Sequence, residues 1–198
     1  MQVRTRHTPA FGVARVILGP GEAVQAPGES MLASSFGLTE AAGGRKSPSV
    51  FTAPAEGGWL DLAPSGAGDV YPLEFDGRTG WCVARHAVLA RPASVRSGAW
   101  PGLRAMFGAD GISQGFLEHY SGTGPLVLAC AGPVDQFQLA AGELISVRPG
   151  HLLAYPDSVQ CRLRALDPSG QQSIRTGEGL MLDFAGPGTL LVQARKSR

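Results

Sequence analysis

Imidazole side chains are the first place to look for chemistry, because histidine is both the common general base and a common metal ligand. The chain has four of them, His7, His86, His119 and His151. None of the four stands beside another at the short spacing of a metal-binding motif. The histidines therefore predict no metal site by their spacing alone.

The surroundings of His151 allow one alternative. The stretch "GELISVRPGHLLAYPDS" resembles the second half of a cupin motif, and cupins are β-barrels that bind metal. A cupin site also needs an H-x-H pair with a carboxylate on an earlier strand. The candidate pair here, Glu118 and His119, would point to opposite faces of a strand. A metal-dependent site of His151 with Glu118 or His119 stays an alternative.

Nucleophilic catalysis finds no support in the cysteines or serines. The chain has no G-x-S-x-G elbow and no local Cys/His pair. Cys82, Cys130 and Cys161 lie in apolar runs typical of strands, which predicts buried structural thiols. Their odd number and the absence of C-x-x-C argue against a disulfide framework or a zinc knuckle and favour the reducing cytoplasm. We assign no catalytic, cofactor-binding or metal-binding residue and expect no cofactor.

Carboxylates and tryptophans give two further candidates. Asp61, Glu118 and Asp183 occupy similar places in three related segments, which could form a ring of acids. An ungapped alignment sets Glu118 against Leu182 instead, so solvated strand faces are the favoured interpretation. The tryptophans could stack on bases or anchor a partner, but aromatic residues at strand positions usually pack against the sheet. They are Trp59, Trp81 and Trp100.

The elements that must position these residues follow from a repeated pattern. Three segments, starting at Val16, Pro72 and Phe137, each show an apolar start, a glycine turn, a short strand, a break, and an apolar pair followed by alanine. The turn glycines Gly21, Gly80 and Gly142 are 59 and 62 residues apart. We expect one β domain over 1–198, with internal repeats near 10–71, 72–133 and 134–198.

Within the repeats, apolar and polar residues alternate with a period of two, as in the stretch from Cys161 to Ala165. Such strands between frequent Gly/Pro turns predict an all-β, antiparallel sandwich or barrel-like fold. One short helix is expected around "WPGLRAMFG" from Trp100, and a long hairpin or loop from Thr39 to Gly58. The "GPG" at Gly186–Gly188 predicts a turn, because no lysine follows it as in a phosphate-binding loop.

The composition and net charge of the chain argue against some classes of binding partner. The chain has 198 residues, 43% of them hydrophobic, and a formal net charge of +1 without a basic run. This balance disfavours DNA, RNA and anionic membranes as electrostatic partners. No continuous apolar stretch matches a signal peptide or a membrane span, so we expect a soluble cytoplasmic protein.

The succession "SGTGPLVLACAG", "GELISVRPGHLLAYPDSV" and "TGEGLMLDFAGPGTLLVQAR" resembles the bacterial and mitochondrial "altered inheritance of mitochondria" family. The resemblance spans nearly the whole chain. It implies a β-rich fold of three internal repeats with pseudo-threefold symmetry, of the double-stranded β-helix type and like the tryptophan RNA-binding attenuation protein (TRAP). No catalytic residues come with the family, whose glycines fall here on the turn positions Gly142, Gly179, Gly186 and Gly188.

Together these features favour a non-enzymatic interaction or scaffold protein with an unidentified protein partner. A cupin-like metal-dependent enzyme or binder is one alternative, and RNA binding by analogy with the attenuation protein is another. Membrane association would need an exposed apolar loop, for example around Val50 and Phe51, and stays open. Uncovered strand edges lead us to expect a monomer or a small homo-oligomer.

Overall fold

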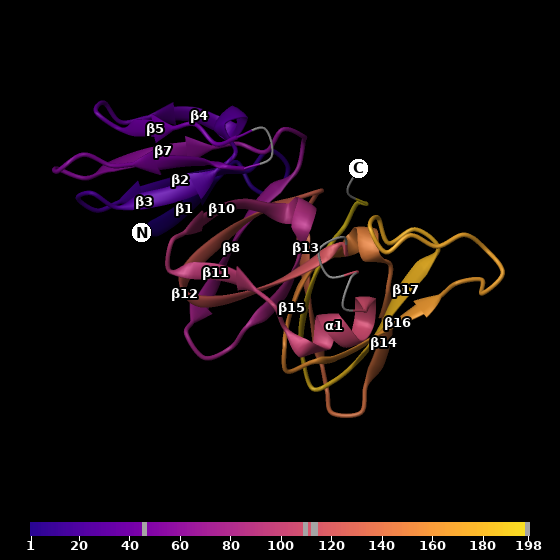
Figure 1. Cartoon of the computed structure of the whole chain (residues 1–198). Helices are drawn as coiled ribbons and strands as arrows, with labels where there is room; N and C mark the ends of the chain where they lie inside the picture. Colours follow the sequence, from indigo (N-terminus) through magenta and orange to yellow (C-terminus); the bar gives the residue numbers. More distant parts are fainter. Residues whose placement is uncertain (45–46, 109–110, 112–114, 197–198) are drawn as a thin grey trace. The chain divides into compact units, whose positions relative to one another are not determined.

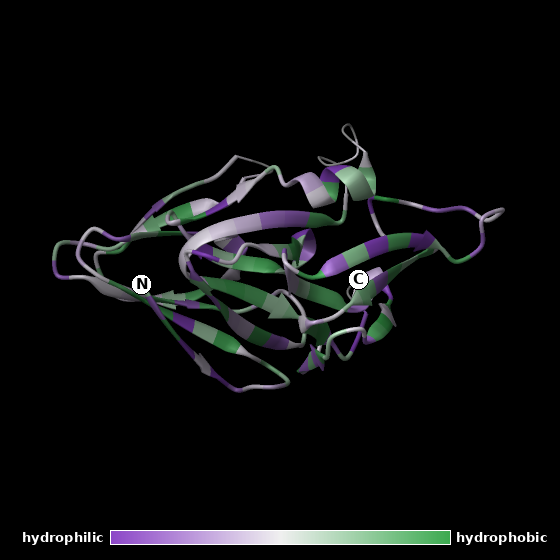
Figure 2. Cartoon of the chain, turned by 90° about the horizontal axis from the view of Figure 1, so that it is seen from below, coloured by the Kyte–Doolittle hydropathy of each residue, from purple (hydrophilic) through white to green (hydrophobic). Residues whose placement is uncertain are grey.

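Alternating side chains produce strands along most of the chain. The computed structural model describes residues 1–44, 47–108, 111 and 115–196. In β17 (Leu180–Ala185), fully buried residues alternate with half-buried ones, and in β16 (Gln160–Ala165) exposed residues alternate with half-buried ones. Figure 2 shows the same alternation as hydrophobic and hydrophilic bands along individual strands. The expected all-β antiparallel fold is confirmed.

The chain divides into two compact units, each assembled from three separate segments. The N-terminal unit contains Met1–Asp76, Val88–Arg96 and Gly122–Pro133. The C-terminal unit contains Gly77–Ala87, Ser97–Ser121 and Val134–Arg198. The long strand β12 (Leu117–Cys130) therefore contributes its first residues to one unit and its last residues to the other.

The N-terminal unit has two layers of strands (Figure 1). One sheet has the order β1 (Gln2–Arg6), β2 (Val13–Leu18), β7 (Gly58–Leu62), β4 (Met31–Ser34). The other has the order β8 (Asp69–Asp76), the last part of β12, β10 (Val88–Pro92), β3 (Ala23–Ala26), β6 (Ser49–Thr52), β5 (Thr39–Ala41). The short strand β11 (Val95–Gly98) also pairs with β12.

The core of the N-terminal unit lies between these layers. Val16 and Leu60 contribute from the first sheet, and Val24, Phe51 and Val127 from the second, all of them at most 1% exposed. Burial of this apolar surface is the main force that holds the two layers together.

The C-terminal unit has the same two-layer construction. Its first sheet has the order β13 (Val134–Leu139), β18 (Gly188–Gln193), β15 (Leu152–Pro156), β9 (Trp81–Ala84), the first part of β12. Its second sheet has the order β14 (Leu144–Val147), β17, β16. Tyr155 of the first sheet and Phe184 of the second meet edge to face, with 5.0 Å between ring centres. Each unit is thus a small β-sandwich.

The helical pieces are short. The helix expected near Trp100 is α1 (Pro101–Phe107), which buries Leu103 and Phe107 and begins with a proline in its first turn. Three 3₁₀ turns precede strands, η1 (Gly28–Ser30), η2 (Arg85–Ala87) and η3 (Pro149–His151). In the segment expected to be a hairpin or loop from Thr39 to Gly58, β5 and β6 pair antiparallel with Thr39 opposite Thr52, and residues 45 and 46 lie outside the described part of the chain.

The "GPG" stretch is a turn, as predicted. Gly186 and Pro187 carry the chain from β17 in one sheet to β18 in the other. Gly186 comes so close to a neighbouring turn that an added Cβ would lie 2.2 Å from the Ala140 carbonyl oxygen. A side chain has no room there, so glycine is required by close approach of two backbones.

The expected pseudo-threefold repeat is not confirmed. The strands gather into two units, and the boundaries of the three proposed repeats near 10–71, 72–133 and 134–198 stay a prediction. Turn signals in a sequence fix where strands end, but they do not fix which sheet each strand joins. Among the described residues, no helix is long and apolar enough to cross a membrane.

Candidate functional site

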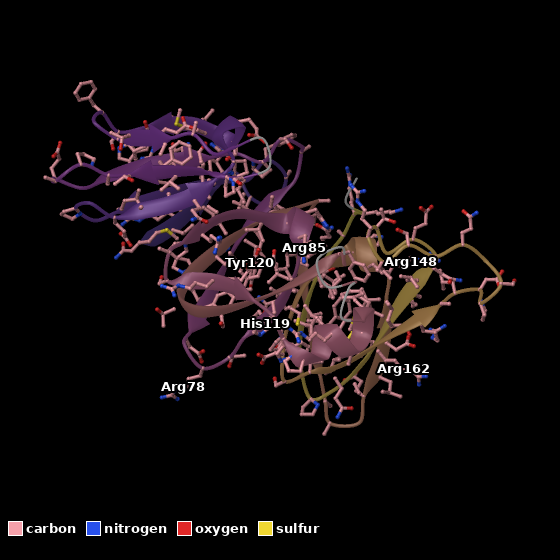
Figure 3. All side chains as sticks on the ribbon, in the orientation of Figure 1. Arg78, Arg85, His119, Tyr120, Arg148 and Arg162 are labelled. Carbon is pink, nitrogen blue, oxygen red and sulfur yellow. The ribbon has the colours of Figure 1, made fainter. Side chains whose placement is uncertain are left out.

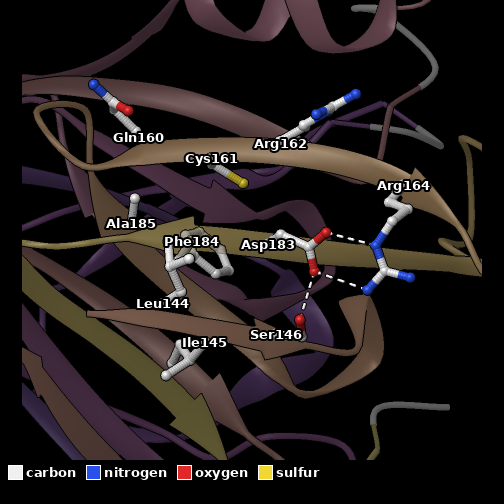
Figure 4. A pocket seen from close by; sticks show the side chains of 10 residues that line it. All are labelled: Leu144, Ile145, Ser146, Gln160, Cys161, Arg162, Arg164, Asp183, Phe184 and Ala185. Carbon is white, nitrogen blue, oxygen red and sulfur yellow. Dashed lines mark hydrogen bonds and ion pairs between the residues drawn. The ribbon is translucent and has the colours of Figure 1, made fainter. Parts of the chain in front are cut away.

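A shallow cavity lies against the sheet β14-β17-β16 of the C-terminal unit (Figure 4). Its volume is about 500 Å³. Pairing of the three strands sets Ser146, Asp183 and Arg162 side by side across the sheet. Residues two apart on a strand share a face, so Leu144 and Arg164 lie on this same face. The cavity therefore combines two guanidinium groups, one carboxylate, one hydroxyl and an apolar margin.

Asp183 is the centre of a hydrogen-bond network in the cavity (Figure 4). Arg164 donates to both carboxylate oxygens, from Nε at 2.6 Å and from Nη2 at 3.0 Å. The Ser146 hydroxyl donates to Oδ1 at 2.5 Å. These donors, Arg164 foremost, lower the pKa of the Asp183 carboxyl from 3.8 to about 2. At neutral pH the carboxylate is ionised and bound on both oxygens, which makes it a poor general base.

Arg162 differs from Arg164 in its partners. It is exposed on β16, and it makes no ion pair with any residue in the described part of the chain. Leu144 on β14, which is separated from Arg162 by β17, is 75% exposed and forms an apolar margin of the cavity. The cavity therefore offers one guanidinium group that makes no ion pair with a described residue and, across β17, an exposed leucine, a pattern suited to a ligand that carries a carboxylate.

Acid should dissolve the Asp183 network. Because the folded-state pKa of Asp183 is lowered, the network contributes stability above about pH 4, which is lost as the pH falls through about 2. Carboxyl-carbon NMR titration should give a midpoint near 2 in the parent protein. Arg164→Gln should return the midpoint toward 3.8, whereas the matched Arg195→Gln variant should leave it unchanged. A midpoint near 3.8 in the parent would contradict the described network.

Glu118 and His119, the expected cupin pair, bind different partners. His119 Nε2 lies 2.9 Å from Asp157 Oδ2, and its ring stacks on Trp100 at 5.7 Å between centres. Glu118 accepts a hydrogen bond of 2.8 Å from the Tyr120 hydroxyl. It also lies 3.5 Å from Arg85. The two side chains point to opposite faces of β12, as the strand geometry predicted.

His151 does not join either residue of that pair. Its Nδ1 lies 3.0 Å from the carbonyl oxygen of Gln193, so the ring is fixed at the start of β15 by β18. His7 and His86 are exposed. Within the residues that the structure describes, no group of three or more His, Cys, Asp or Glu side chains could hold a metal ion. The geometry of a cupin centre is not assembled from the predicted residues.

Two of the three cysteines are buried, as predicted, and the third is half-buried. Cys82 and Cys130 are 0% and 4% exposed, and Cys161 is half-buried; all three are free. Burial raises the pKa of each thiol to about 12, so almost none is present as the reactive thiolate at neutral pH. The Tyr155 hydroxyl is buried beside Cys82 and Cys161, without an oxygen or nitrogen partner.

The expectation of a solvated strand face is wrong for Asp61, which is 2% exposed. Arg15 donates to both of its oxygens at 2.8 and 2.9 Å, and Arg6 donates at 2.7 Å. Arg15 also lies over the Trp59 ring, 4.0 Å from its centre. Two guanidinium groups replace the lost water and permit the burial. Asp61, Glu118 and Asp183 have separate partners and form no ring of acids.

Sequence reasoning identified Asp183 but missed its association with Ser146 and Arg164. The alternation of "CRLRA" placed Arg162 and Arg164 on one face, which was the available signal. The third strand, β14, is joined to β17 through residues almost forty positions away, as Ser146 lies opposite Asp183. No local pattern reveals that pairing.

Comparison with known proteins agrees with the fold. The family model described as "Mitochondrial biogenesis AIM24" matches residues 3–195, which is nearly the whole chain. The chain belongs to the AIM24 family. Among solved structures, protein SPYM3_0169 from Streptococcus pyogenes matches with a TM-score of 0.75 and 20% identity. The match covers 98% of this chain and 94% of that one. No curated protein matches the chain.

AIM24 membership confirms the family that the sequence motifs suggested. The streptococcal structure supports the fold alone, because its sequence identity to this chain is low. Neither comparison assigns a ligand or a catalytic residue to the cavity on β14-β17-β16.

Proposed function

We propose that this AIM24-family chain is a non-enzymatic interaction module that binds an acidic segment of a partner protein in the cavity on β14-β17-β16. The proposal rests on a difference between the charged side chains of the cavity in their ion pairing. Asp183 is engaged by Arg164 and Ser146, whereas Arg162 makes no ion pair with a described residue. The Asp183 carboxylate is thus bound within the chain, whereas the exposed Arg162 can donate hydrogen bonds to a carboxylate of the partner.

Neighbouring side chains extend this surface. Leu144 gives it an apolar contact, and Gln160 on β16 adds an amide beside Arg162. Arginine is enriched at protein interfaces, and the buried centre of an interface is more apolar than its rim. The three free thiols are consistent with the reducing cytoplasm, which we propose as the site of action.

The test compares partner capture by three forms of the tagged protein in its native cells. We expect a partner that copurifies with the parent and is lost with Arg162→Glu, because the reversed charge repels its carboxylates. The exposed Arg148, outside the cavity, gives the matched control, and Arg148→Glu should retain the partner (Figure 3). Raised salt should weaken capture by the parent, as for any exposed ion pair.

Two outcomes would reject the proposal. Equal retention of every partner by the parent and by Arg162→Glu would exclude this cavity as the binding surface. One equivalent of metal in the purified parent, lost in His151→Ala, would instead support the cupin-like alternative.

A further inference from the structure

Three strands occupy equivalent places next to a bulge. Each of β4, β10 and β15 pairs with a neighbouring strand through the same irregularity, in which two steps along the strand match one step of its neighbour. The bulges begin at Met31, Val88 and Leu152. A bulge fixes register, so these three residues mark corresponding positions.

Two of these three bulged strands, β10 and β15, are also paired along their other edge. β10 pairs with β3, where Arg91 lies opposite Gln25. β15 pairs with β9, where Tyr155 lies opposite Cys82. Arg91 and Tyr155 each lie three positions after the start of their bulge, at 88 + 3 and 152 + 3.

The residues opposite Arg91 and Tyr155 also lie at a constant distance along the chain from a bulge. Gln25 lies six positions before Met31, and Cys82 lies six positions before Val88, at 31 − 6 and 88 − 6. Both junctions therefore have one register: the strand preceding one bulge pairs with the strand of the next bulge along the chain. The rule is the same in the N-terminal and in the C-terminal unit.

Two edges remain without this pairing. β4 ends the sheet β1-β2-β7-β4, and β14 ends the sheet β14-β17-β16. In the part of the chain that the structure describes, neither has a strand on its outer side. β14 precedes the last bulge of the chain, and β4 contains the first. If the register rule continues from the last bulge to the first, it pairs β14 with β4 and sets Ser34 (31 + 3) opposite Ser146 (152 − 6).

The exposure of a leucine found in all three bulges indicates that β4 lacks a neighbouring strand on its outer edge. The second bulge residue is a leucine in all three strands, and it is 4% exposed at Leu89 and 0% at Leu153. At Leu32 on β4 it is 59% exposed. The apolar side chain is uncovered only where the neighbouring strand is lacking, which is the condition for edge-to-edge association.

Two further exposed residues fall into the same register. Two steps beyond the Tyr155–Cys82 pair, Asp157 donates its backbone N–H to Gly80 at 2.9 Å. Two steps beyond Ser34 and Ser146, the rule places Phe36 level with Leu144. These side chains are 101% and 75% exposed, the highest values among the exposed large hydrophobic residues of the described chain.

We propose that copies of this chain associate head to tail, with the β14 edge of one copy paired antiparallel to the β4 edge of the next. Ser146 of one copy then lies opposite Ser34 of the other, and Leu144 beside Phe36. The two edges differ, so the contact is heterologous: it closes into a ring where the rotation permits and otherwise continues. This association goes beyond the acidic partner proposed above and does not depend on it.

The first test is the molar mass in solution over a wide range of concentration, by chromatography with light scattering. The parent should show multiples of 20.6 kDa. Phe36→Lys and Leu144→Lys should each weaken association at least tenfold, because each places an ammonium group in the apolar contact. Phe11 is 70% exposed outside both edges, so Phe11→Lys is the matched control and should associate like the parent.

Mixing shows the direction of the contact. Each lysine variant keeps one intact edge, so Phe36→Lys mixed with Leu144→Lys should form a dimer through the two unaltered edges. A parent that stays at 20.6 kDa at every concentration would overturn the proposal. So would a parent that associates as before after both substitutions in one chain.

A backbone variant checks that strand pairing is responsible. The N–H of Ser35 donates to Trp59 on β7, so the N–H of Ser34 faces the outer edge of β4. Ser34→Pro removes this donor without a loss to β7 and should abolish association while leaving the unfolding transition cooperative. Normal association of Ser34→Pro would contradict the proposed edge.

Crosslinking tests the register. Opposed residues of a hydrogen-bonded antiparallel pair have Cα atoms about 5.5 Å apart, within the range of a disulfide. Copies with Ser34→Cys mixed with copies with Ser146→Cys should give an oxidised product of twice 20.6 kDa. Ser94→Cys, in an exposed turn, should not react with either. Crosslinking of Ser146→Cys copies with one another would overturn the head-to-tail arrangement.

Discussion

Replacing Phe184 by alanine should lower the free energy of unfolding by about 4 kcal/mol. Phe184 is 1% exposed, and its ring meets Tyr155 of the opposite sheet at 5.0 Å between centres. The substitution leaves a cavity at the contact between the two layers of the C-terminal unit. Chemical denaturation followed by circular dichroism measures the loss.

Leu166→Ala is the control for Phe184→Ala. Leu166 is 42% exposed and lies just after β16, so its truncation should cost less than about 1 kcal/mol. Equal losses for the two variants would mean that the interior of the C-terminal unit is not packed around Phe184.

Asp61→Ala should cost about 3 kcal/mol of unfolding free energy, because it leaves the guanidinium groups of Arg6 and Arg15 without their shared anion. Asp183→Ala provides the comparison. Asp183 is also bound by an arginine, but its side chain is 32% exposed and that of Arg164 is 49% exposed. Water can replace the exposed pair, so we expect a loss below about 1 kcal/mol there. Denaturation of both variants at neutral pH measures the difference.

The Asp61 effect should also depend on pH. The hydrogen bonds from Arg15, together with those from Arg6, lower the pKa of Asp61 from 3.8 to about 2. A lowered carboxyl pKa gives stability that is present above about pH 4 and disappears as the pH falls through about 2. The gap between the parent and Asp61→Asn should therefore close over this interval. A gap that is independent of pH would show that the ionised carboxylate is not what stabilises the N-terminal unit.

Local sequence patterns predicted much of the architecture. Alternation in "CRLRA" predicted β16, and the stretch "WPGLRAMFG" predicted α1. The apolar surroundings of Cys82 predicted its burial. These properties depend on near neighbours in the chain, so a sequence window contains the information.

Long-range pairing could not be predicted in the same way. Asp61 depends on Arg6 and Arg15, which are 55 and 46 residues away, and was therefore misread as solvated. The cavity depends on Ser146 lying opposite Asp183. Nothing in either segment specifies the other, and the free energy of such contacts is decided only when the sheets form.

The interleaving of the two units has a consequence for synthesis on the ribosome. The N-terminal unit needs Gly122–Pro133, so it cannot be completed when its first 76 residues have emerged. Two segments of the C-terminal unit, Gly77–Ala87 and Ser97–Ser121, emerge before that point and must wait for the strands that follow Val134. Because the segments of the two units alternate along the chain, no single division of the sequence yields one complete unit on each side. Neither unit can therefore finish folding before most of the chain has been synthesised.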